Sequence, residues 1–308
     1  MGIEMTQDQV AAFAVVYGAS GLGKSTDMAA TFPNALFVCR PGGMQCAASF
    51  LGLGVREIHV RTLEDVINLI PHAKEHGHDA IVVDDLSLLA ESTERDFDVS
   101  GQGARNKFAK FSHLNSLAAA LREQGRFAGI HFAANAHERP KGRDAQGRER
   151  RGGPRLASWN MADSVVHEAS LVLRCTQDGS RAGKWKSVYD CGRDGWIGKD
   201  RLTAAAERSP QNLRAILAAG GYTLSRPPGL EWQDEVVGSV TNKLNSGEDL
   251  ASVVEALWPK LTGAGLDPRQ VAWALRDAIA AHELAQATAN RFRDLFDFTT
   301  PGASAFGS

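Results

Sequence analysis

One short stretch near the start of the chain constrains its fold more than any other feature. Residues 18–26 read GASGLGKST and fit the phosphate-binding pattern G-x-x-x-x-G-K-[ST]. Glycines let the backbone curl so that successive N–H groups point at phosphate oxygens. A helix that begins near Lys24 would aim the positive end of its dipole at the same anion. The stretch therefore predicts a site for a nucleoside triphosphate.

The residue types of this loop have separate chemical tasks. Lys24 would bring a mobile positive charge to the β- and γ-phosphates of ATP, and the Ser25 hydroxyl would be a ligand of Mg²⁺. An apolar run of strand length, 12–17, precedes the loop, and 26–30 reads as the helix that follows it. We expect the nucleotide to contact the whole loop, namely Gly18, Ser20, Gly21, Gly23, Lys24, Ser25 and Thr26.

A second acidic motif lies further along the chain. Residues 79–85 read DAIVVDD, in which an apolar run ends in acid. A buried parallel strand that carries a Mg²⁺-binding aspartate has this pattern. Asp84 would hold the Mg²⁺ directly or through water. The alternative interpretation is a strand that simply ends in a polar turn.

Strand and helix patterns alternate through the first 225 residues. Apolar runs predict strands at 35–39, 58–60 and 127–134, and helical periodicity predicts helices at 62–70 and 108–121, the latter ended by Gly125. Thr62 is placed to cap its helix, with Asp65 three residues later. The polar residues 91–105 read as an exposed loop. This alternation predicts an α/β fold with a largely parallel sheet.

The later part of the chain departs from this alternation. Residues 169–175 and 185–191 read as a β-hairpin around a turn at 177–180, and 210–219 as a short helix. A linker at 226–229 precedes helices expected at 232–244, 249–261, 268–284 and on to about 296. We therefore expect a core over 1–225 and a small helical C-terminal region over 226–308, with a disordered tail from 299.

Residues 138–155 are strongly basic and rich in glycine. Such a segment cannot bury a core and is expected to be mobile without a ligand. It reads either as a solvated charged loop or as a contact element for the phosphates of nucleic acid. The candidate DNA-binding side chains are Arg139, Lys141, Arg143, Arg148, Arg150 and Arg151.

Composition limits the partners and the compartment. The formal net charge is −2, so a nucleic-acid site must be a local patch. The four cysteines form no C-x-x-C pair, which favours a reduced intracellular compartment. No run of about 18 apolar residues is present, so no membrane partner is expected. The N-terminus lacks the pattern of a secretory signal, and we expect a cytoplasmic protein.

The order of these motifs resembles a RecA-type ATPase core, and more narrowly the phage-encoded P-loop ATPases grouped with RecA-like single-strand annealing proteins. The resemblance covers roughly residues 10–225. It is carried by the loop 18–26, by FPNALFV at 32–38 with Gly42 and Gly43 after it, by 81–85, and by Asn135 and His137 before the basic segment. If phage-encoded, the protein would act in the cytoplasm of a bacterial host cell.

The resemblance implies a mechanism. Asn135 or His137 would sense the γ-phosphate, and the basic segment would grip single-stranded DNA when ATP is bound. Subunits would assemble head to tail into a ring or filament. Lys199 and Arg201 resemble basic residues that such proteins present to a neighbour's nucleotide, where they would stabilise charge on the transferred phosphoryl group. An exposed basic turn is the alternative.

One departure from the family concerns the catalytic base. RecA-like ATPases carry a glutamate after the second strand, where this chain has Arg40 and Pro41. Asp85 or Glu57 could replace it. Without a positioned base, hydrolysis should be slow, because general-base assistance contributes about 10²–10⁴-fold.

The leading hypothesis is an ATPase of phage-type recombination that binds or anneals single-stranded DNA. The alternatives are a nucleotide-gated assembly protein that hydrolyses ATP weakly and binds no DNA, and another P-loop DNA motor of the packaging or helicase kind.

Overall fold

A single large sheet forms the centre of the protein. The computed structural model describes residues 11–100, 109–144, 146–178, 186–201, 205, 208–226 and 229–296. The strand order of the sheet is β13-β11-β10-β1-β5-β4-β2-β3, with β12 paired to β10. The strands are β1 (Phe13–Gly18), β2 (Leu36–Cys39), β3 (Arg56–Ile58), β4 (Ala80–Asp84), β5 (His131–Ala136), β10 (Leu171–Asp178), β11 (Lys186–Asp190), β12 (Lys199–Asp200) and β13 (Arg208–Pro210).

Most of this sheet is parallel. β10, β1, β5, β4, β2 and β3 pair in parallel along the order above, whereas β11, β12 and β13 pair with their neighbours antiparallel. The predicted α/β fold with a largely parallel sheet is therefore confirmed. The predicted hairpin is also present as β10 and β11. Gln177 and Asp178, predicted in its turn, belong to β10, and residues 179–185 lie outside the described part of the chain.

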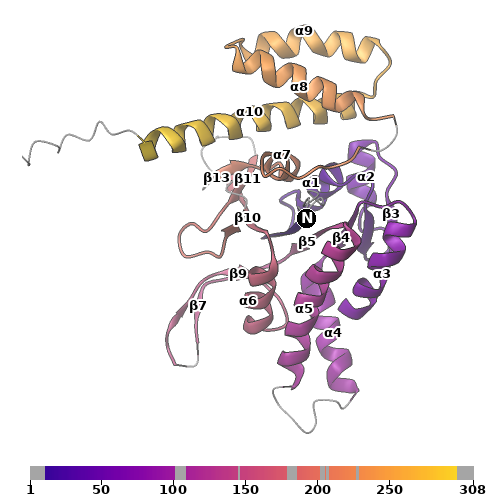
Figure 1. Ribbon diagram of the computed structural model, residues 1–308, viewed down its shortest axis with the longest axis vertical. Coiled ribbons are helices and arrows are strands. Elements are labelled where there is room, and N and C mark those ends of the chain that lie inside the picture. The colour runs from indigo at the N-terminus through magenta and orange to yellow at the C-terminus, as the bar shows by residue number, and fades with distance from the viewer. Residues whose placement is uncertain are drawn as a thin grey trace, which may run out of the picture.

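Helices cover both faces of the sheet (Figure 1). Side chains of β1 alternate between the two layers: Ala14 and Val16 belong to one apolar cluster, and Phe13, Val15 and Tyr17 to the other. Because both faces of β1 are buried, it reads as a continuous apolar run. The first layer contains α1 (Lys24–Thr31), α2 (Gln45–Leu51) and α7 (Leu213–Ala219); the second contains α3 (Leu63–Glu75), α4 (Leu86–Val99), α5 (Ala109–Ala128) and α6 (Trp159–Glu168).

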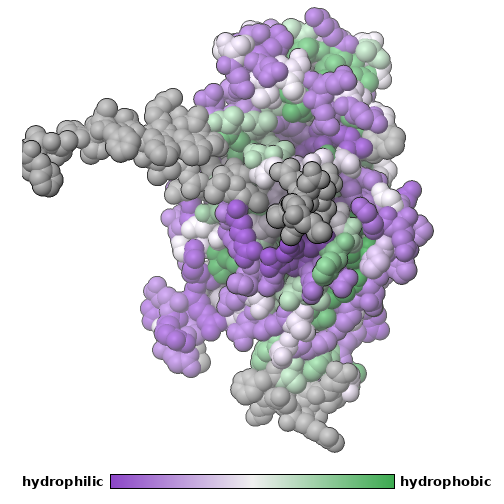
Figure 2. Space-filling model, viewed as in Figure 1, coloured by the Kyte–Doolittle hydropathy of each residue, from purple (hydrophilic) through white to green (hydrophobic). Residues whose placement is uncertain are grey.

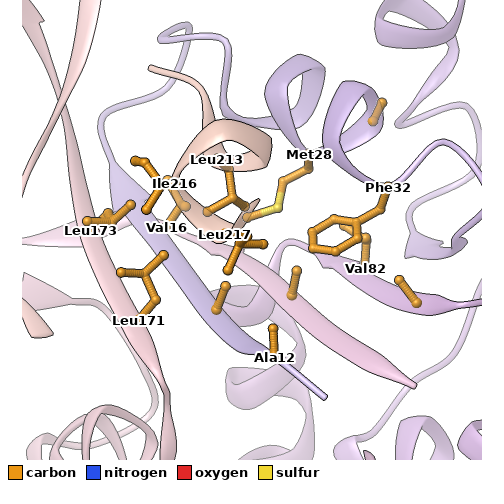
Figure 3. Close-up of a cluster of buried hydrophobic side chains, with 14 of the residues drawn as sticks. Ala12, Val16, Met28, Phe32, Val82, Leu171, Leu173, Leu213, Ile216 and Leu217 are labelled. Atoms are coloured by element: carbon orange, nitrogen blue, oxygen red, sulfur yellow. The ribbon is translucent and has the colours of Figure 1, made fainter. Parts of the chain in front are cut away.

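The first layer shows how α1 is fixed behind the phosphate-binding loop. Met28 within α1 and Phe32 just past its end pack with Leu213 and Ile216 of α7 over the strands of the sheet (Figure 3). All four side chains are at most 1% exposed. Burying a side chain of this size contributes about 1.5–3 kcal/mol. The helix that follows the loop is thus held by an apolar contact with a helix encoded nearly 200 residues later.

Several element boundaries differ from the sequence prediction. The segment predicted as a loop from residue 91 belongs to α4 as far as Val99, because Leu89, Ala90 and Phe97 form a buried face of this helix; residues 101–108 lie outside the described part. Gly125 does not end α5, which continues to Ala128 before Gly129 turns with φ of 61°. The predicted cap at Thr62 is confirmed, with reciprocal bonds between Thr62 and Asp65.

The C-terminal residues form a helical layer at one end of the molecule. It contains α8 (Trp232–Asn245), α9 (Leu250–Gly263) and α10 (Pro268–Phe296), and α10 is one helix where two were predicted. A small apolar cluster joins the three helices through Val240, Val253 and Val271, among others. Ala280 and Leu284 of α10 belong instead to the first layer of the sheet. Helix α10 therefore takes part in two apolar clusters.

The basic segment 138–155, predicted as a mobile charged loop, forms two short antiparallel β-ribbons. β6 (Glu138–Arg139) pairs with β9 (Gly153–Pro154), and β7 (Gly142–Arg143) pairs with β8 (Glu149–Arg150). We call residues 138–155 the basic arm. It extends away from the sheet in Figure 1 and is strongly hydrophilic in Figure 2. Within the described residues, no helix is long and apolar enough to cross a membrane.

A buried histidine makes the stability of the sheet dependent on pH. His131 Nδ1 accepts a hydrogen bond from the backbone N–H of Ala12 at 3.0 Å, and Nε2 donates to the carbonyl of Thr223 at 3.1 Å. The bond from Ala12 requires a neutral ring, because Nδ1 can accept only when it carries no proton, whereas the bond to Thr223 favours the charged ring. Burial is the larger effect and lowers the pKa of His131 below its usual 6.5. A lowered pKa means that the unfolded chain takes up a proton first as the pH falls.

We therefore expect the full contribution of His131 above about pH 6.5 and a loss as the pH falls below it. Between the unfolded and folded pKa values, the free energy of unfolding should drop by up to about 1.4 kcal/mol per pH unit. Urea unfolding of the wild type and of His131→Gln, which does not titrate, should be compared from pH 8 to pH 5 (about the usable range). Parallel pH profiles for the two proteins would contradict this assignment.

Candidate functional site

The phosphate-binding loop joins the carboxyl end of β1 to the first turn of α1. Gly23 stands at the N-cap of α1 with φ of 77°, a left-handed conformation that glycine adopts without steric cost. A Cβ atom at Gly18 would lie 2.4 Å from the carbonyl oxygen of Cys175 on β10, so only glycine fits there. Ser20, Gly21 and Gly23 are exposed, whereas Leu22 is buried. The open side of the loop is therefore free of bulky side chains.

Lys24 lies inside the curl of this loop. Its Nζ donates to the carbonyl oxygens of Gly18 at 3.0 Å and Ala19 at 2.8 Å. Burial lowers the pKa of Lys24, while Cys175, Asp84 and Asp85 oppose that shift. The side chain of Lys24 is only 9% exposed, and both of its hydrogen-bond partners are neutral carbonyls. An anion bound in the loop would therefore offer Lys24 a stronger, charge-assisted hydrogen bond.

Ser25, Asp84 and Asn135 come together from α1, β4 and β5. Burial raises the pKa of Asp84, and the nearby side chains of Ser25 and Asn135 oppose this shift. The amide of Asn135 is buried, and neither its nitrogen nor its oxygen has a hydrogen-bond partner of normal geometry in the described residues. Unpaired buried polar atoms are costly, so this amide indicates a missing polar partner.

The donor set at this point fits a small divalent cation. A hydroxyl and a carboxylate are oxygen ligands of the kind Mg²⁺ prefers, and Mg²⁺ usually takes one or two protein oxygens together with water and substrate phosphates. Among the described residues, no group of three or more His, Cys, Asp or Glu side chains is placed to hold a metal by itself. The fit of Ser25 and Asp84 therefore depends on phosphate oxygens completing the shell.

Asp85 and His137 form a pair at the same edge of the sheet. Asp85 Oδ2 lies 2.8 Å from His137 Nε2, and Asp85 Oδ1 accepts from the backbone N–H of Leu88 at 3.0 Å. The backbone N–H of His137 donates to Ser87 Oγ at 2.9 Å. Asp85 thus caps α4 and orients the imidazole of His137 at once. The peptide bond between Asp84 and Asp85 is cis.

The carboxyl end of β2 carries a cavity but no catalytic glutamate. Glu57, one of the predicted replacements, accepts hydrogen bonds from the backbone N–H groups of Gly42 at 3.0 Å and Met44 at 2.8 Å, so its carboxylate is used in the turn after β2. Arg40 follows β2 beside the acidic pair, because Cys39 is level with Asp84 in the sheet. A cavity of about 230 Å³ lies there and is lined by Arg40, Asp84 and Asp85, among others.

Lys199 and Arg201 lie at the opposite edge of the sheet from the loop. In the sheet, Lys199 lies level with Val172 near the start of β10. The loop begins at Gly18, which lies level with Cys175, three residues further along the same strand. Both basic side chains donate to the carbonyl of His167 at the end of α6, Arg201 at 2.7 Å. Burial, with Arg201 and Arg122 nearby, lowers the pKa of Lys199 to about 8. The structure does not bring this pair to the phosphate-binding loop of its own chain.

The predicted DNA-binding residues differ in whether their side chains already form ion pairs or hydrogen bonds within the protein. Arg148 forms an ion pair with Asp144 at 2.7 Å, and Arg151 donates to the carbonyl of Trp196 at 2.6 Å. Arg143 lies 4.0 Å from Glu149. These three contacts are internal to the basic arm or to its root.

The other three predicted DNA-binding residues lie over tryptophan rings. Arg139 and Arg150 lie 3.0 and 4.8 Å from the ring centre of Trp159, and Lys141 lies 6.0 Å from that of Trp196. Burial lowers the pKa of Arg139 to about 10, with Asp163 opposing and Arg150 adding to the shift. Positive charge beside aromatic rings is a combination that single-stranded nucleic-acid sites use.

The root of the basic arm is bonded directly to the acidic edge of the sheet. The backbone N–H of Arg155 donates to the carbonyl of His137 at 2.7 Å, and Glu138 pairs with Pro154 one residue further on. The side chain of Arg155 also forms an ion pair with Glu91 of α4 at 2.7 Å. The arm and the Asp85–His137 pair therefore share one backbone segment.

Sequence reasoning missed residues that support the loop from behind. Gln211 Nε2 donates to the carbonyl of Leu22 inside the loop at 2.7 Å, and Asp27 in the first turn of α1 is buried among polar partners. Asp27 has no distinguishing signal, because an acid in the first turn of a helix is also favoured by the helix dipole at exposed positions. Nothing in the sequence marks Gln211 or the residues that contact Asp27.

Comparison with known proteins adds little to this geometry. No family model and no curated protein matches the sequence. Among solved structures, the chain is similar to a KaiC-like protein from the hyperthermophilic archaeon Pyrococcus horikoshii, with 11% identity, 65% of this chain and 84% of that chain covered, and a TM-score of 0.40. At this identity and TM-score the similarity carries no function from that protein to this chain.

Proposed function

We propose that this protein binds ATP with Mg²⁺ and hydrolyses it slowly. The observation that supports this most directly is the meeting of Ser25, Asp84 and the unpaired amide of Asn135 beside Lys24 at one edge of the sheet. Lys24 exchanges its two carbonyl partners for phosphate oxygens. Ser25 and Asp84 would hold Mg²⁺, which would neutralise charge on the β- and γ-phosphates when bound. The amide of Asn135 gains the polar partner that it lacks.

The Asp85–His137 pair is the proposed base. Asp85 accepts from Nε2 of His137, which leaves Nδ1 to take a proton from the attacking water. A carboxylate that orients an imidazole in this way fixes its tautomer and stabilises the charged ring. Asp85 therefore acts through His137, and this pair takes the place of the glutamate that RecA-like ATPases carry after the second strand.

We further propose that the basic arm binds single-stranded DNA and that binding stimulates turnover. Six basic side chains, with Trp159 and Trp196 beside three of them, support the binding. The backbone bond between Arg155 and His137 supports the coupling, because a shift of the arm would move the residue proposed as base. This would place the protein among DNA-dependent ATPases of recombination.

Head-to-tail assembly belongs to the same proposal. A residue that acts on a neighbour's nucleotide must lie away from its own loop, as Lys199 and Arg201 do. Their bonds to the carbonyl of His167 would have to open for that role. A nucleotide-gated assembly protein with weak hydrolysis and no DNA binding is the second candidate, and it is favoured by the presence of Arg40 where the glutamate is expected.

Removing the amine of Lys24 tests the central claim. Lys24→Ala should lower the affinity for ATP·Mg²⁺ and abolish turnover, because the loop loses its only side-chain cation. Lys74→Ala, which removes an exposed lysine on α3, is the control and should behave as wild type. Binding of a fluorescent ATP analogue and phosphate release are the measurements. Equal turnover in Lys24→Ala and wild type would refute the site.

The proposed role of His137 as base is tested by comparison with a second histidine that also pairs with a carboxylate. His113 Nε2 lies 2.7 Å from Glu64 on the outer helices, so it has the same chemistry away from the loop. His137→Ala should reduce kcat by about 10²–10⁴-fold at nearly unchanged ATP affinity, whereas His113→Ala should leave kcat within about twofold of wild type. Similar kcat values for both variants would exclude His137 as base.

Salt dependence tests the basic arm. The double variant Lys141→Ala/Arg150→Ala should weaken binding of a single-stranded oligonucleotide and reduce the slope of log K against log salt by about 1.4, since each phosphate contact contributes about 0.7. Lys74→Ala/Arg126→Ala removes the same charge from exposed positions on α3 and α5 and should keep the wild-type slope. Fluorescence anisotropy with and without ATP measures both. If the two double variants share one slope, the arm is not the DNA site.

A further inference from the structure

A buried carboxylate lies directly behind the phosphate-binding loop. Asp27 belongs to the first turn of α1, three residues after Lys24, and is 2% exposed. Its Oδ2 accepts from the hydroxyl of Tyr189 at 2.5 Å and from the backbone N–H of Leu213 at 3.0 Å. Its Oδ1 accepts from Nη1 of Arg276 at 3.1 Å. Burial raises the pKa of Asp27, and Arg276 most strongly opposes this shift.

The segment 211–213 connects the loop to these partners. Gln211 holds the carbonyl of Leu22 in the loop, and Leu213 donates to Asp27. Between them, Asn212 caps α7 and donates through Nδ2 to Oδ1 of Asp277 at 2.8 Å. Three consecutive residues thus contact the loop, helix α10 and helix α1 in turn.

Helix α10 contacts this network with two consecutive residues. Arg276 reaches Asp27, with its guanidinium 4.3 Å from the ring centre of Trp273, and Asp277 holds Asn212. Asp277 also accepts from Arg226 at 3.0 Å, so it remains paired on both oxygens. The side chain of Arg276 is one-third exposed, whereas that of Asp27 is closed off from solvent. The C-terminal helix therefore supplies the only cation bonded to Asp27 within the described residues.

We propose that Arg276 is a positioning residue for the nucleotide site: through Asp27 and the segment 211–213, helix α10 holds the phosphate-binding loop in its binding conformation. The inference rests on the proposed ATP binding and adds the C-terminal helices to that site. Arg276 touches neither the loop nor the acidic edge, so it acts on affinity and leaves the chemical step alone. Coupling of this kind is reciprocal: whatever moves α10 alters ATP binding, and ATP binding stabilises α10.

The experiment compares ATP binding and turnover in the full-length chain. Arg276→Ala should raise the Kd and KM for ATP about 5- to 150-fold, the range of typical coupling between sites, with kcat within about twofold of wild type. Arg276→Lys keeps the charge and should give an intermediate Kd. Lys260→Ala removes an exposed cation from α9 and should match wild type. A purely structural ion pair would lower the Tm of Arg276→Ala without changing the Kd of the folded protein.

A second measurement does not depend on the variant folding. Hydrogen exchange of the wild-type chain should slow in 213–219 and 271–280 when ATP·Mg²⁺ is added, although neither segment lies at the loop. Unchanged exchange there, or an unchanged Kd in Arg276→Ala, overturns the inference while the ATP site stands. A wild-type chain that binds no ATP removes the proposed function, and this inference with it.

Discussion

The parallel pairing of β1 with β5, and of β5 with β4, is the constraint on which the candidate site depends. Parallel strands that lie side by side end at the same edge of the sheet, where open α/β sheets bind ligands. The phosphate-binding loop after β1, Asp84 in β4 and Asn135 in β5 therefore meet, although more than 100 positions separate the loop from Asn135. A one-residue slip in either pairing would turn these side chains to the wrong face.

Much of this edge could be predicted from the sequence. The loop pattern, the apolar run ending in Asp84 and Asp85, and the alternation of strands and helices are local signals that carry their own physical reasons. The ends of elements were less predictable. Polar residues after position 91 read as a loop because the periodic apolar side chains that bury one face of α4 are spaced among charges. Tertiary packing decides such helices, and propensity is a weak guide to them.

The support behind the loop could not be predicted. Asp27 and Arg276 lie 249 positions apart, and no pattern in either neighbourhood points to the other. The same holds for Gln211, whose contact with the loop depends on how α7 enters the first layer. The role of Glu57 could not be predicted either, since only the fold shows that its carboxylate accepts hydrogen bonds from the turn after β2. Contacts between distant segments depend on the topology of the whole fold, and local sequence patterns do not reveal them.

The glycines at the root of the basic arm have a consequence for how it meets a ligand. A Cβ atom at Gly152 would lie 2.4 Å from the ring of Trp196, and one at Gly153 would lie 2.7 Å from Ile197. Backbone bonds of 3.1 and 2.7 Å link Gly152 to Gly195 and Ile197. The arm is thus wedged against the body before any partner arrives. Its ordering entropy is lost during folding, so any ligand of the arm would bind a preorganised surface at a lower entropic cost.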